Sequence, residues 1–472
     1  MLNNLTPKAI TAQGRIEHMD SQQTSTPQDR PAPNLPVRRA GDFFGLEAAG
    51  TTVGREIIAG VTTFVTMAYV IAVNPAILAA AGIPAGPAMV ATIATAVFGT
   101  LVMGLYANRP FAIAPYMGEN AFIAFTVVRT LGFRWQTALG AVFLAGLLFI
   151  ALTVARIRQW MLDAVPLGLR YSFAVGIGLF LTFIGLNETG IVALGVTGAP
   201  VKIGNLASPA VLVAIFGFVL TAILMIRRVP GAILIGILAA TFVAFAAGVA
   251  KPPATWIGLP PNPAPIILKL DIHGALSWGF FGVLLTIFTM ALIDTMGTLV
   301  GLSARAGFLD ENGQLPQIER PMLADALATA FAGLAGTTTA GAYIESAAGV
   351  AAGGRTGLTS VVTAMLFALA LFFAPFVTAI PPQAYGPALI VVGALIVAPI
   401  TKINFDDYTE LIPAFSVIAL MTFTYNIGIG ITAGFILYPL FKAAAGRWRE
   451  IRPGLWVLAA LSMLFYIFYP YR

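Results

Sequence analysis

The 472-residue chain contains no cysteine and only two histidines. Without cysteine, disulfides and thiolate metal sites are excluded. The histidines, His18 and His273, fall in the N-terminal tail and in a loop, which excludes a histidine proton relay inside a membrane. Charged residues are also scarce, at 10% of the chain, whereas soluble domains carry roughly 25%. Because 58% of the residues are hydrophobic and apolar runs of about 20 residues recur, we predict a polytopic membrane protein.

Motifs that support catalysis are missing as well. The chain has no phosphate-binding loop, no metal-ligand spacing and no nucleophile elbow, so we expect no enzyme activity, no cofactor and no bound metal. The net charge of +6 comes from basic residues at the ends of apolar segments and does not indicate nucleic-acid binding. Residues 1–44 are polar and rich in Pro, Gln and Ser, which predicts a disordered cytoplasmic tail without a secretory signal.

Apolar segments predict an all-α fold of fourteen membrane spans, seven on each side of a Pro-rich extracytoplasmic loop at 251–277. The spans are expected at 56–80, 87–107, 111–131, 136–156, 166–186, 207–227 and 230–250, and then at 278–302, 322–336, 341–353, 357–380, 384–400, 409–426 and 428–446. With the N-terminus inside, most Lys and Arg residues fall in cytoplasmic loops. One more apolar segment, 454–469, either crosses the membrane or lies against the bundle.

The two halves share a series of short matches in the same order. At an offset of 234 residues, Pro87 and Thr95 correspond to Pro321 and Thr329 without a gap. Each match is weak alone, but their common order indicates an internal repeat. Since seven is an odd number of spans, the second copy enters the membrane from the opposite side. Inverted repeats of this kind underlie many alternating-access transporters.

Two segments break the rules for a membrane helix. Residues 336–355 open with a Thr run and Gly341, and residues 108–125 carry Pro110 and Pro115, all of which disfavour helix. Irregular backbone within a membrane must be buried in protein or line a wet cavity. We expect two short antiparallel strands, each followed by a half-helix, which meet near the midplane in spans 3 and 10. The alternative is a pair of kinked helices packed by small residues.

Carboxylates lie at or near these breaks, and an acid within the membrane is a functional-site hypothesis by default. Glu345 begins the second half-helix and could accept two N–H groups of a planar heterocycle, hold a proton, or only cap the helix. Asp294 lies mid-span among threonines, without a nearby basic residue. It is therefore either protonated part of the time, paired with a ligand, or bonded to the threonines.

The first break repeats this arrangement. Glu119 and Asn120 occupy the mirror positions of Glu345 and Ser346. Asn120 offers both a donor and an acceptor, which suits the edge of a base, whereas Glu119 is either a third titrating group or a cap. Asn74 precedes a proline, and we expect it to satisfy the kink rather than contact substrate. Three acids without an intramembrane basic residue favour a neutral or cationic cargo that moves with H⁺ or Na⁺.

Several long motifs resemble the nucleobase–cation symporter type 2 family, and within it the AzgA-like branch of purine permeases. They are FVTMAYVIAVNPAIL, APYMGENAF, IDTMGTLVGLSARAGFLDENG and AYIESAAGVAAGGRTGLTSVVTAMLF. The resemblance covers about residues 43–452. It implies import of adenine, guanine, hypoxanthine or a related base with protons, across the cell membrane in which the protein is embedded. A homodimer is one open alternative for its assembly.

The resemblance also implies a division into domains. A core domain would comprise 45–160 and 278–380, a gate domain 161–250 and 381–446, and residues 447–472 would form a basic loop and a terminal hydrophobic segment. The substrate would lie between spans 3, 8 and 10. Carried over by position, the residues expected to bind the base are Asp294, Glu345, Asn120, Thr298, Tyr116 and Ser346. Those expected to carry the proton are Glu345, Asp294 and Glu119.

Two departures from the branch affect substrate choice. The branch usually reads GMGLNAF where this chain reads YMGENAF, so Tyr116 and Glu119 are unusual. Many relatives also carry an acid where this chain has Ala291. The same fold with another cargo, such as uracil or xanthine, and a channel or receptor without coupled transport are therefore the alternatives.

Overall fold

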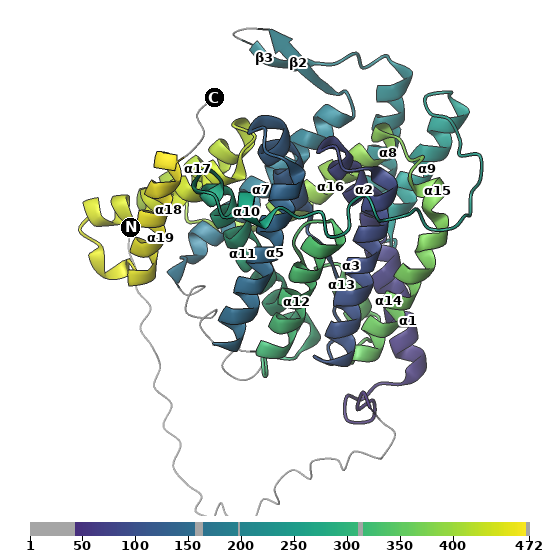
Figure 1. The fold of residues 1–472 in the computed structure, drawn as a ribbon, viewed down its shortest axis with the longest axis horizontal. Coiled ribbons are helices and arrows are strands. Elements are labelled where there is room, and N and C mark those ends of the chain that lie inside the picture. The colour runs from purple at the N-terminus through teal and green to yellow at the C-terminus, as the bar shows by residue number, and fades with distance from the viewer. Residues whose placement is uncertain (1–42, 156–163, 197–198, 310–314, 469–472) are drawn as a thin grey trace, which may run out of the picture. The chain divides into compact units, whose positions relative to one another are not determined.

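The computed structural model describes residues 43–155, 164–196, 199–309 and 315–468 (Figure 1). These residues are mostly helical, as predicted. Within them, nine stretches of helix are long and apolar enough to cross a membrane, and three shorter apolar helices accompany them. The predicted cytoplasmic tail lies, except for its last two residues, outside the described residues.

The first half of the chain runs from α1 to α9. Its elements are α1 (Val53–Met67), α2 (Val70–Ala80), α3 (Ala85–Leu105), β1 (Ile113–Pro115), α4 (Met117–Ala121), the π-helix η1 (Phe122–Thr130), α5 (Trp135–Val154), α7 (Leu167–Glu188), β2 (Val192–Val196), β3 (Ala199–Ile203), α8 (Pro209–Ile226) and α9 (Ala232–Ala246). The β2–β3 hairpin, at the top of Figure 1, was not predicted, since the connection between spans 5 and 6 carries only a short alternating pattern.

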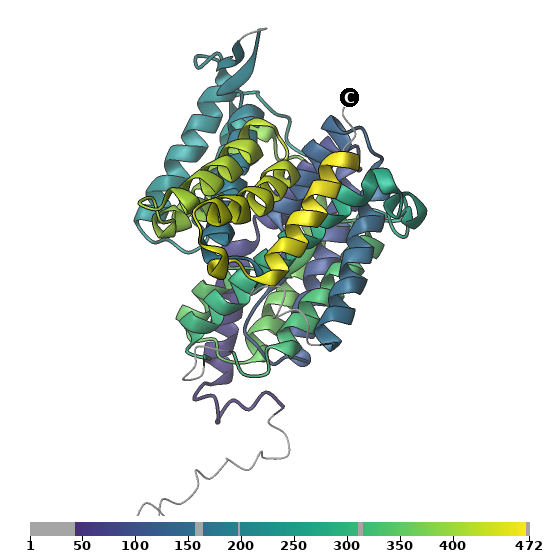
Figure 2. The same cartoon turned by 90° about the vertical axis from the view of Figure 1, so that its left-hand side faces the viewer.

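The second half runs from α10 to α18 and is followed by α19. Its elements are α10 (Ile272–Ala275), η2 (Trp278–Phe280), α11 (Phe281–Ala306), α12 (Glu319–Ala335), β4 (Ala340–Ala342), α13 (Ser346–Ala351), α14 (Gly357–Ala370), η3 (Leu371–Phe373), α15 (Ala374–Val377), α16 (Pro382–Val397), η4 (Ala398–Lys402), α17 (Tyr408–Phe423), α18 (Ile427–Ala444), η5 (Trp448–Glu450) and α19 (Pro453–Phe468). The terminal helix α19 packs against α18 and α11 (Figure 2). Its Tyr466 hydroxyl donates to the Ile429 carbonyl at 3.1 Å.

The two short strands β1 and β4 pair with each other in antiparallel register, with Ile113 opposite Ala342. Each strand also bonds to the helix that precedes it. The Thr100 hydroxyl of α3 accepts from the Ile113 N–H at 2.9 Å, and the Thr329 hydroxyl of α12 donates to the Ala340 carbonyl at 2.7 Å. These bonds satisfy backbone N–H and C=O groups of the two strands, which cannot be helical next to proline and glycine.

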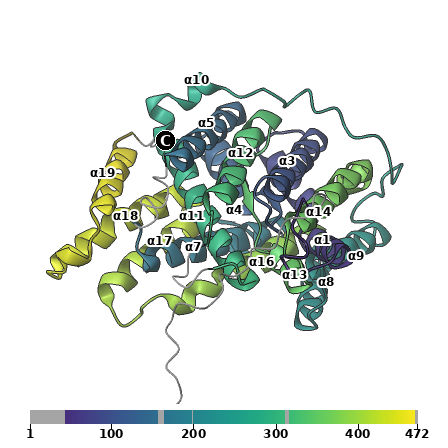
Figure 3. The same cartoon turned by 90° about the horizontal axis from the view of Figure 1, so that it is seen from below.

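Helices from the two halves pack closely on either side of this strand pair. The rings of Phe98 in α3 and Phe331 in α12 stack with centroids 4.4 Å apart. Seen from below, α4 lies beside α7 and α11 (Figure 3). The half-helix after β1 therefore meets the long helix that carries Asp294.

A buried carboxylate joins α1 to the start of α14. Glu56 is fully buried and accepts five hydrogen bonds from Arg355, Thr356 and Thr359, at and just before the start of α14. Its Oε1 accepts from the Arg355 N–H at 2.9 Å, and its Oε2 accepts from the N–H and hydroxyl groups of Thr356 and Thr359 at 2.6–3.2 Å. A carboxylate at a helix N-terminus meets unpaired N–H groups and the positive end of the helix dipole, which explains why it is stable there.

Candidate functional site

The acids of the first break and of α11 meet directly. Asp294 lies midway along α11 and is partly exposed, whereas Glu119 in α4 is fully buried. Their carboxyl groups lie within hydrogen-bonding reach of each other. Among the described residues, no N–H or O–H group donates to either oxygen of Glu119. Glu119 is therefore not a helix cap in this structure, and the side chain within hydrogen-bonding reach of it belongs to another acid.

Glu345 is held by a residue that was not predicted. It occupies the N-cap position of α13, but its side chain makes no capping hydrogen bond. Its Oε1 instead accepts from the Tyr69 hydroxyl at 2.7 Å. Tyr69 lies between α1 and α2, where the first membrane helix is interrupted. An aromatic hydroxyl within an otherwise apolar run was the available signal for Tyr69, because a buried Tyr O–H usually finds a partner.

Two tyrosines stack beside these acids. Tyr116 and Tyr343 follow β1 and β4, and their rings are nearly parallel, with an interplanar angle of 8° and centroids 6.2 Å apart. The Tyr343 side chain is close enough to interact electrostatically with Glu119, Asp294 and Glu345. All three predicted acids therefore lie within electrostatic range of Tyr343, which itself was not predicted as a site residue.

A fourth acid, Asp325 in α12, completes the cluster. It is buried, and it accepts from the Thr295 hydroxyl and from the Ala342 N–H, the latter at 2.9 Å. Thr295 in turn accepts from the Tyr116 hydroxyl at 3.4 Å. The sequence-based count of three acids was therefore incomplete. The criterion used for Asp294, an acid within an apolar span, applies equally to Asp325 and would have found it.

Asn120 is buried and belongs to a network of amides and hydroxyls. Its amide nitrogen donates to Asn74 Oδ1, and the Asn74 amide donates to the hydroxyls of Thr92 at 2.7 Å and Thr337 at 3.0 Å. The Asn120 Oδ1 has no partner among the described residues. Asn74 therefore joins four segments through side chains instead of satisfying the kink beside it, and Asn120 retains one free acceptor.

The last two predicted contacts differ in their surroundings. Thr298 lies one turn beyond Asp294 on the same partly exposed face of α11, next to the exposed Gly297. Ser346 is fully buried, and its hydroxyl accepts from the Ala112 N–H at 3.0 Å. Thr298 is thus placed with the acids, whereas the Ser346 hydroxyl is engaged in holding the chain that leads into β1.

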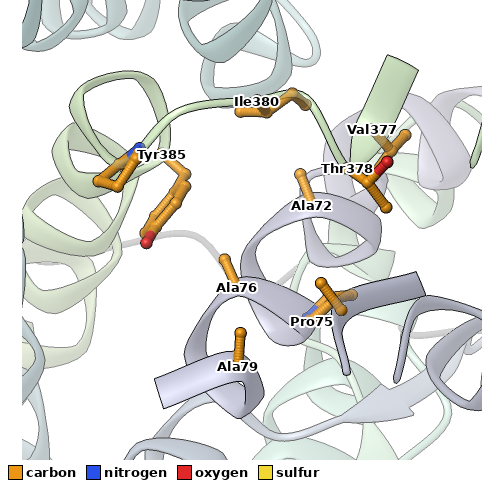
Figure 4. A pocket seen from close by; sticks show the side chains of 10 residues that line it. Ala72, Pro75, Ala76, Ala79, Val377, Thr378, Ile380 and Tyr385 are labelled. Carbon is orange, nitrogen blue, oxygen red and sulfur yellow. The ribbon is translucent and has the colours of Figure 1, made fainter. Parts of the chain in front are cut away.

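Close to the end of α2 lies a separate cleft of about 190 Å³ (Figure 4). Ala72, Ala76 and Ala79 of α2 line one side, and Thr378 and Tyr385 line the other. None of the predicted site residues lines this cleft. Its wall is mostly apolar, and it offers two hydroxyl groups but no acid of the cluster.

A helical membrane bundle with two broken segments and acids gathered where they meet defines the class of the protein as a transporter. Residues 54–436 match a family model described as the permease family. The chain belongs to this permease family, and the resemblance to purine permeases of the nucleobase–cation symporter type 2 family is confirmed. It is a transporter and not an enzyme.

Curated relatives match over nearly their whole lengths. The protein MJ0326 of Methanocaldococcus jannaschii is 47% identical, over 90% of this chain and 98% of its own. Guanine/hypoxanthine permease PbuO of Bacillus subtilis is 42% identical, over 90% and 99%. Adenine permease AdeQ of Escherichia coli is 40% identical, over 89% and 95%.

Solved transporter structures share the fold at low sequence identity. The transmembrane domain of the cyanobacterial bicarbonate transporter BicA aligns with a TM-score of 0.60 and 18% identity, and covers 80% of this chain and 96% of its own. Murine solute carrier 26 family member A9, an anion transporter, aligns with a TM-score of 0.58 and 10% identity, and covers 93% and 74%. At these identities the likeness concerns the fold alone.

Proposed function

We propose that the protein is a proton-coupled secondary transporter that imports purine nucleobases of the adenine, guanine and hypoxanthine class by alternating access. The observation that carries this proposal is the convergence of Asp294, Glu345 and Glu119 beside two stacked tyrosines, at the point where the strands pair. Close relatives are named adenine and guanine/hypoxanthine permeases, which supports the substrate class.

The proposed topology has fourteen crossings arranged as a 7+7 inverted repeat, with the N-terminus inside. In this scheme, α1 with α2, α14 with α15, and the segments around β1 and β4 each count as one crossing. The core domain would contain the broken segments and α11, and the gate domain would contain α7 to α9 and α16 to α18. The antiparallel pairing of β1 with β4, and the Thr bonds that hold each strand to the preceding helix, support opposite directions of membrane insertion.

The chemistry of the site suits a planar, neutral base. Carboxylate oxygens of Asp294 and Glu345 would accept the ring N–H groups, and the free Oδ1 of Asn120 adds a further acceptor close by. A tyrosine ring provides an aromatic face for such a base, and aromatic contacts of this kind contribute about 0.5–1.5 kcal/mol beyond the area buried. The proton would be held on a carboxyl group of Glu345, Asp294 or Glu119.

Transport would follow from movement of the core domain against the gate domain. The base binds together with a proton from outside, the core then exposes the site to the cytoplasm, and loss of the proton weakens binding. Only differential affinity of the two states for base and proton can drive this change. The Tyr69 hydroxyl, which holds Glu345, would keep that carboxylate aimed at the base throughout.

Uptake of labelled hypoxanthine into cells that express the protein tests this function. We expect unlabelled purines to compete, uracil and xanthine to compete poorly, and a protonophore to abolish accumulation. Glu345→Gln should remove uptake at low base concentration, whereas the matched change Glu319→Gln, at an exposed position in the first turn of α12, should not. Competition by uracil or xanthine alone would reassign the cargo. Flux without accumulation would indicate a channel, and binding without counterflow in vesicles would indicate a receptor.

A further inference from the structure

Glu119 differs from Glu345, Asp325 and Glu56 because no group donates a hydrogen bond to it among the described residues. Glu345 accepts from a tyrosine hydroxyl, Asp325 accepts from a threonine hydroxyl and a backbone N–H, and Glu56 accepts five hydrogen bonds. Glu119 is fully buried, like Glu56 and Asp325, yet neither of its oxygens receives a hydrogen from an N–H or O–H group of the described residues. A buried carboxylate without donors or a counter-ion is strongly disfavoured, so such a group takes up a proton instead.

The neighbour of Glu119 is the carboxyl group of Asp294, within hydrogen-bonding reach. Two carboxyl groups can form a hydrogen bond only when one of them supplies the hydrogen. The other charged group that acts on Glu119 is the acid Asp325 of α12, and the hydroxyls of Tyr116 and Tyr343 are its further titratable neighbours. Because the described residues around the pair add negative charge and include no cation, the pair retains one proton more readily than it ionises twice.

We propose that the coupling proton resides on the Glu119–Asp294 carboxyl pair and that Glu345 serves as a charged acceptor for the base; this rests on the proposed proton-coupled transport. Glu345 accepts a hydrogen bond from the Tyr69 hydroxyl at 2.7 Å, whereas Glu119 accepts none among the described residues, so a negative charge is better stabilised on Glu345 than on Glu119. Asp294, which is partly exposed, links the buried Glu119 to the space where substrate would bind.

In the transport cycle that follows from this proposal, the carboxyl pair takes up and releases one proton, and the base itself is not chemically changed. A base N–H donates to the outer oxygen of Asp294, and the shared proton is held toward Glu119. When the site opens to the cytoplasm, the base leaves, water reaches Asp294, and the pair releases its proton to that side. One proton therefore accompanies each base, and the doubly ionised pair is reloaded from outside.

Proteoliposomes that contain a pH-sensitive dye test the assignment, with hypoxanthine as the base. In wild type and in the control Glu319→Gln, added hypoxanthine should drive proton influx. In Glu119→Gln, whose side chain can bond to Asp294 but cannot titrate, proton influx should disappear while hypoxanthine counterflow remains. Glu345→Gln should bind hypoxanthine more weakly but keep the wild-type ratio of protons to base at saturating base. A wild-type proton ratio in Glu119→Gln, or loss of proton influx only in Glu345→Gln, would overturn the assignment.

Infrared difference spectroscopy of the purified protein separates this inference from the function on which it rests. A protonated carboxyl group gives a C=O band that shifts in heavy water, and we expect the wild type to show one. Glu119→Gln should remove this band, whereas Asp294→Asn should change its frequency, because Glu119 stays buried and protonated there but loses its carboxyl partner. If wild-type vesicles moved no purine with protons, the proposed function would fail, and this band would still decide whether the pair shares a proton. A band that is unchanged in both variants would refute the pair. If Glu119→Gln did not fold, the frequency of the band in Asp294→Asn would decide, since only a carboxyl that shares its proton with Asp294 changes its hydrogen bond in this variant.

Discussion

The buried carboxylate of Glu56 allows a quantitative test of how α1 and α14 are held together. Replacement by alanine would leave three backbone N–H groups and two hydroxyls of the α14 N-terminus without their acceptor. Because these groups are buried, water cannot easily replace the lost carboxylate. We therefore expect Glu56→Ala to destabilise the folded protein strongly, and Glu56→Gln to have a smaller effect.

The magnitude follows from the hydrogen bonds. A hydrogen bond to a charged group contributes about 1.5–3 kcal/mol, but bonds that share one acceptor are not additive. Removal of one partner from a buried ionic cluster costs about 3–5 kcal/mol, which we expect for Glu56→Ala. At roughly 2 °C per kcal/mol for a large domain, the melting temperature should fall by about 6–10 °C. Four of the five bonds fall on Oε2, so a glutamine carbonyl that replaces this oxygen should limit the loss to about half.

The assay is thermal unfolding of the purified protein in detergent, followed by intrinsic fluorescence and by recovery of the monodisperse species after heating. Glu319→Gln is the control, because Glu319 also lies in the first turn of a helix but is exposed. We expect the wild type and Glu319→Gln to share the highest melting temperature, Glu56→Gln to melt lower, and Glu56→Ala to melt lowest. If Glu56→Ala melted together with the wild type, the clamp between α1 and α14 would contribute nothing and the reasoning would be refuted.

Two further predictions concern the strand pair and a charged cluster outside the spans. A Cβ at Gly341 would lie 2.0 Å from the Tyr116 hydroxyl, so Gly341→Ala should displace that ring and reduce hypoxanthine uptake per folded molecule. The control Gly301→Ala, whose Cβ would meet only an atom 3.8 Å away, should leave uptake unchanged. Equal uptake by the two variants would contradict this prediction. The Thr409 hydroxyl that donates to Asp407 holds the pKa of this acid below its ordinary value. A depressed folded-state pKa stabilises the fold above the unfolded value of about 4 and loses that contribution as the pH falls further, so melting temperatures should decline in acid for the wild type and less steeply for Asp407→Asn. Parallel curves for the two proteins would exclude Asp407 as a cause.

Most elements of the fold could be predicted from local sequence. Apolar runs predict membrane helices because hydrocarbon requires about 20 apolar residues per crossing. Prolines and the Thr–Gly run locate both broken segments, since these residues cannot continue a helix without losing hydrogen bonds. The β2–β3 hairpin and the interruption at Tyr69 were not predicted, because short alternating or aromatic stretches are compatible with more than one conformation.

The sequence by itself determined that acids lie within apolar spans, since an ionisable residue in such a run is visible from composition alone. Only the tertiary structure decided which groups these acids face: Glu119 meets Asp294, Glu345 meets Tyr69, and Asp325 meets a threonine and a strand. The physical reason is that periodicity and propensity act over a few residues along the chain. The partner of a buried carboxyl group is instead set by the packing of segments far apart in sequence, and that packing determines whether the acid is charged, capped or left to hold a proton.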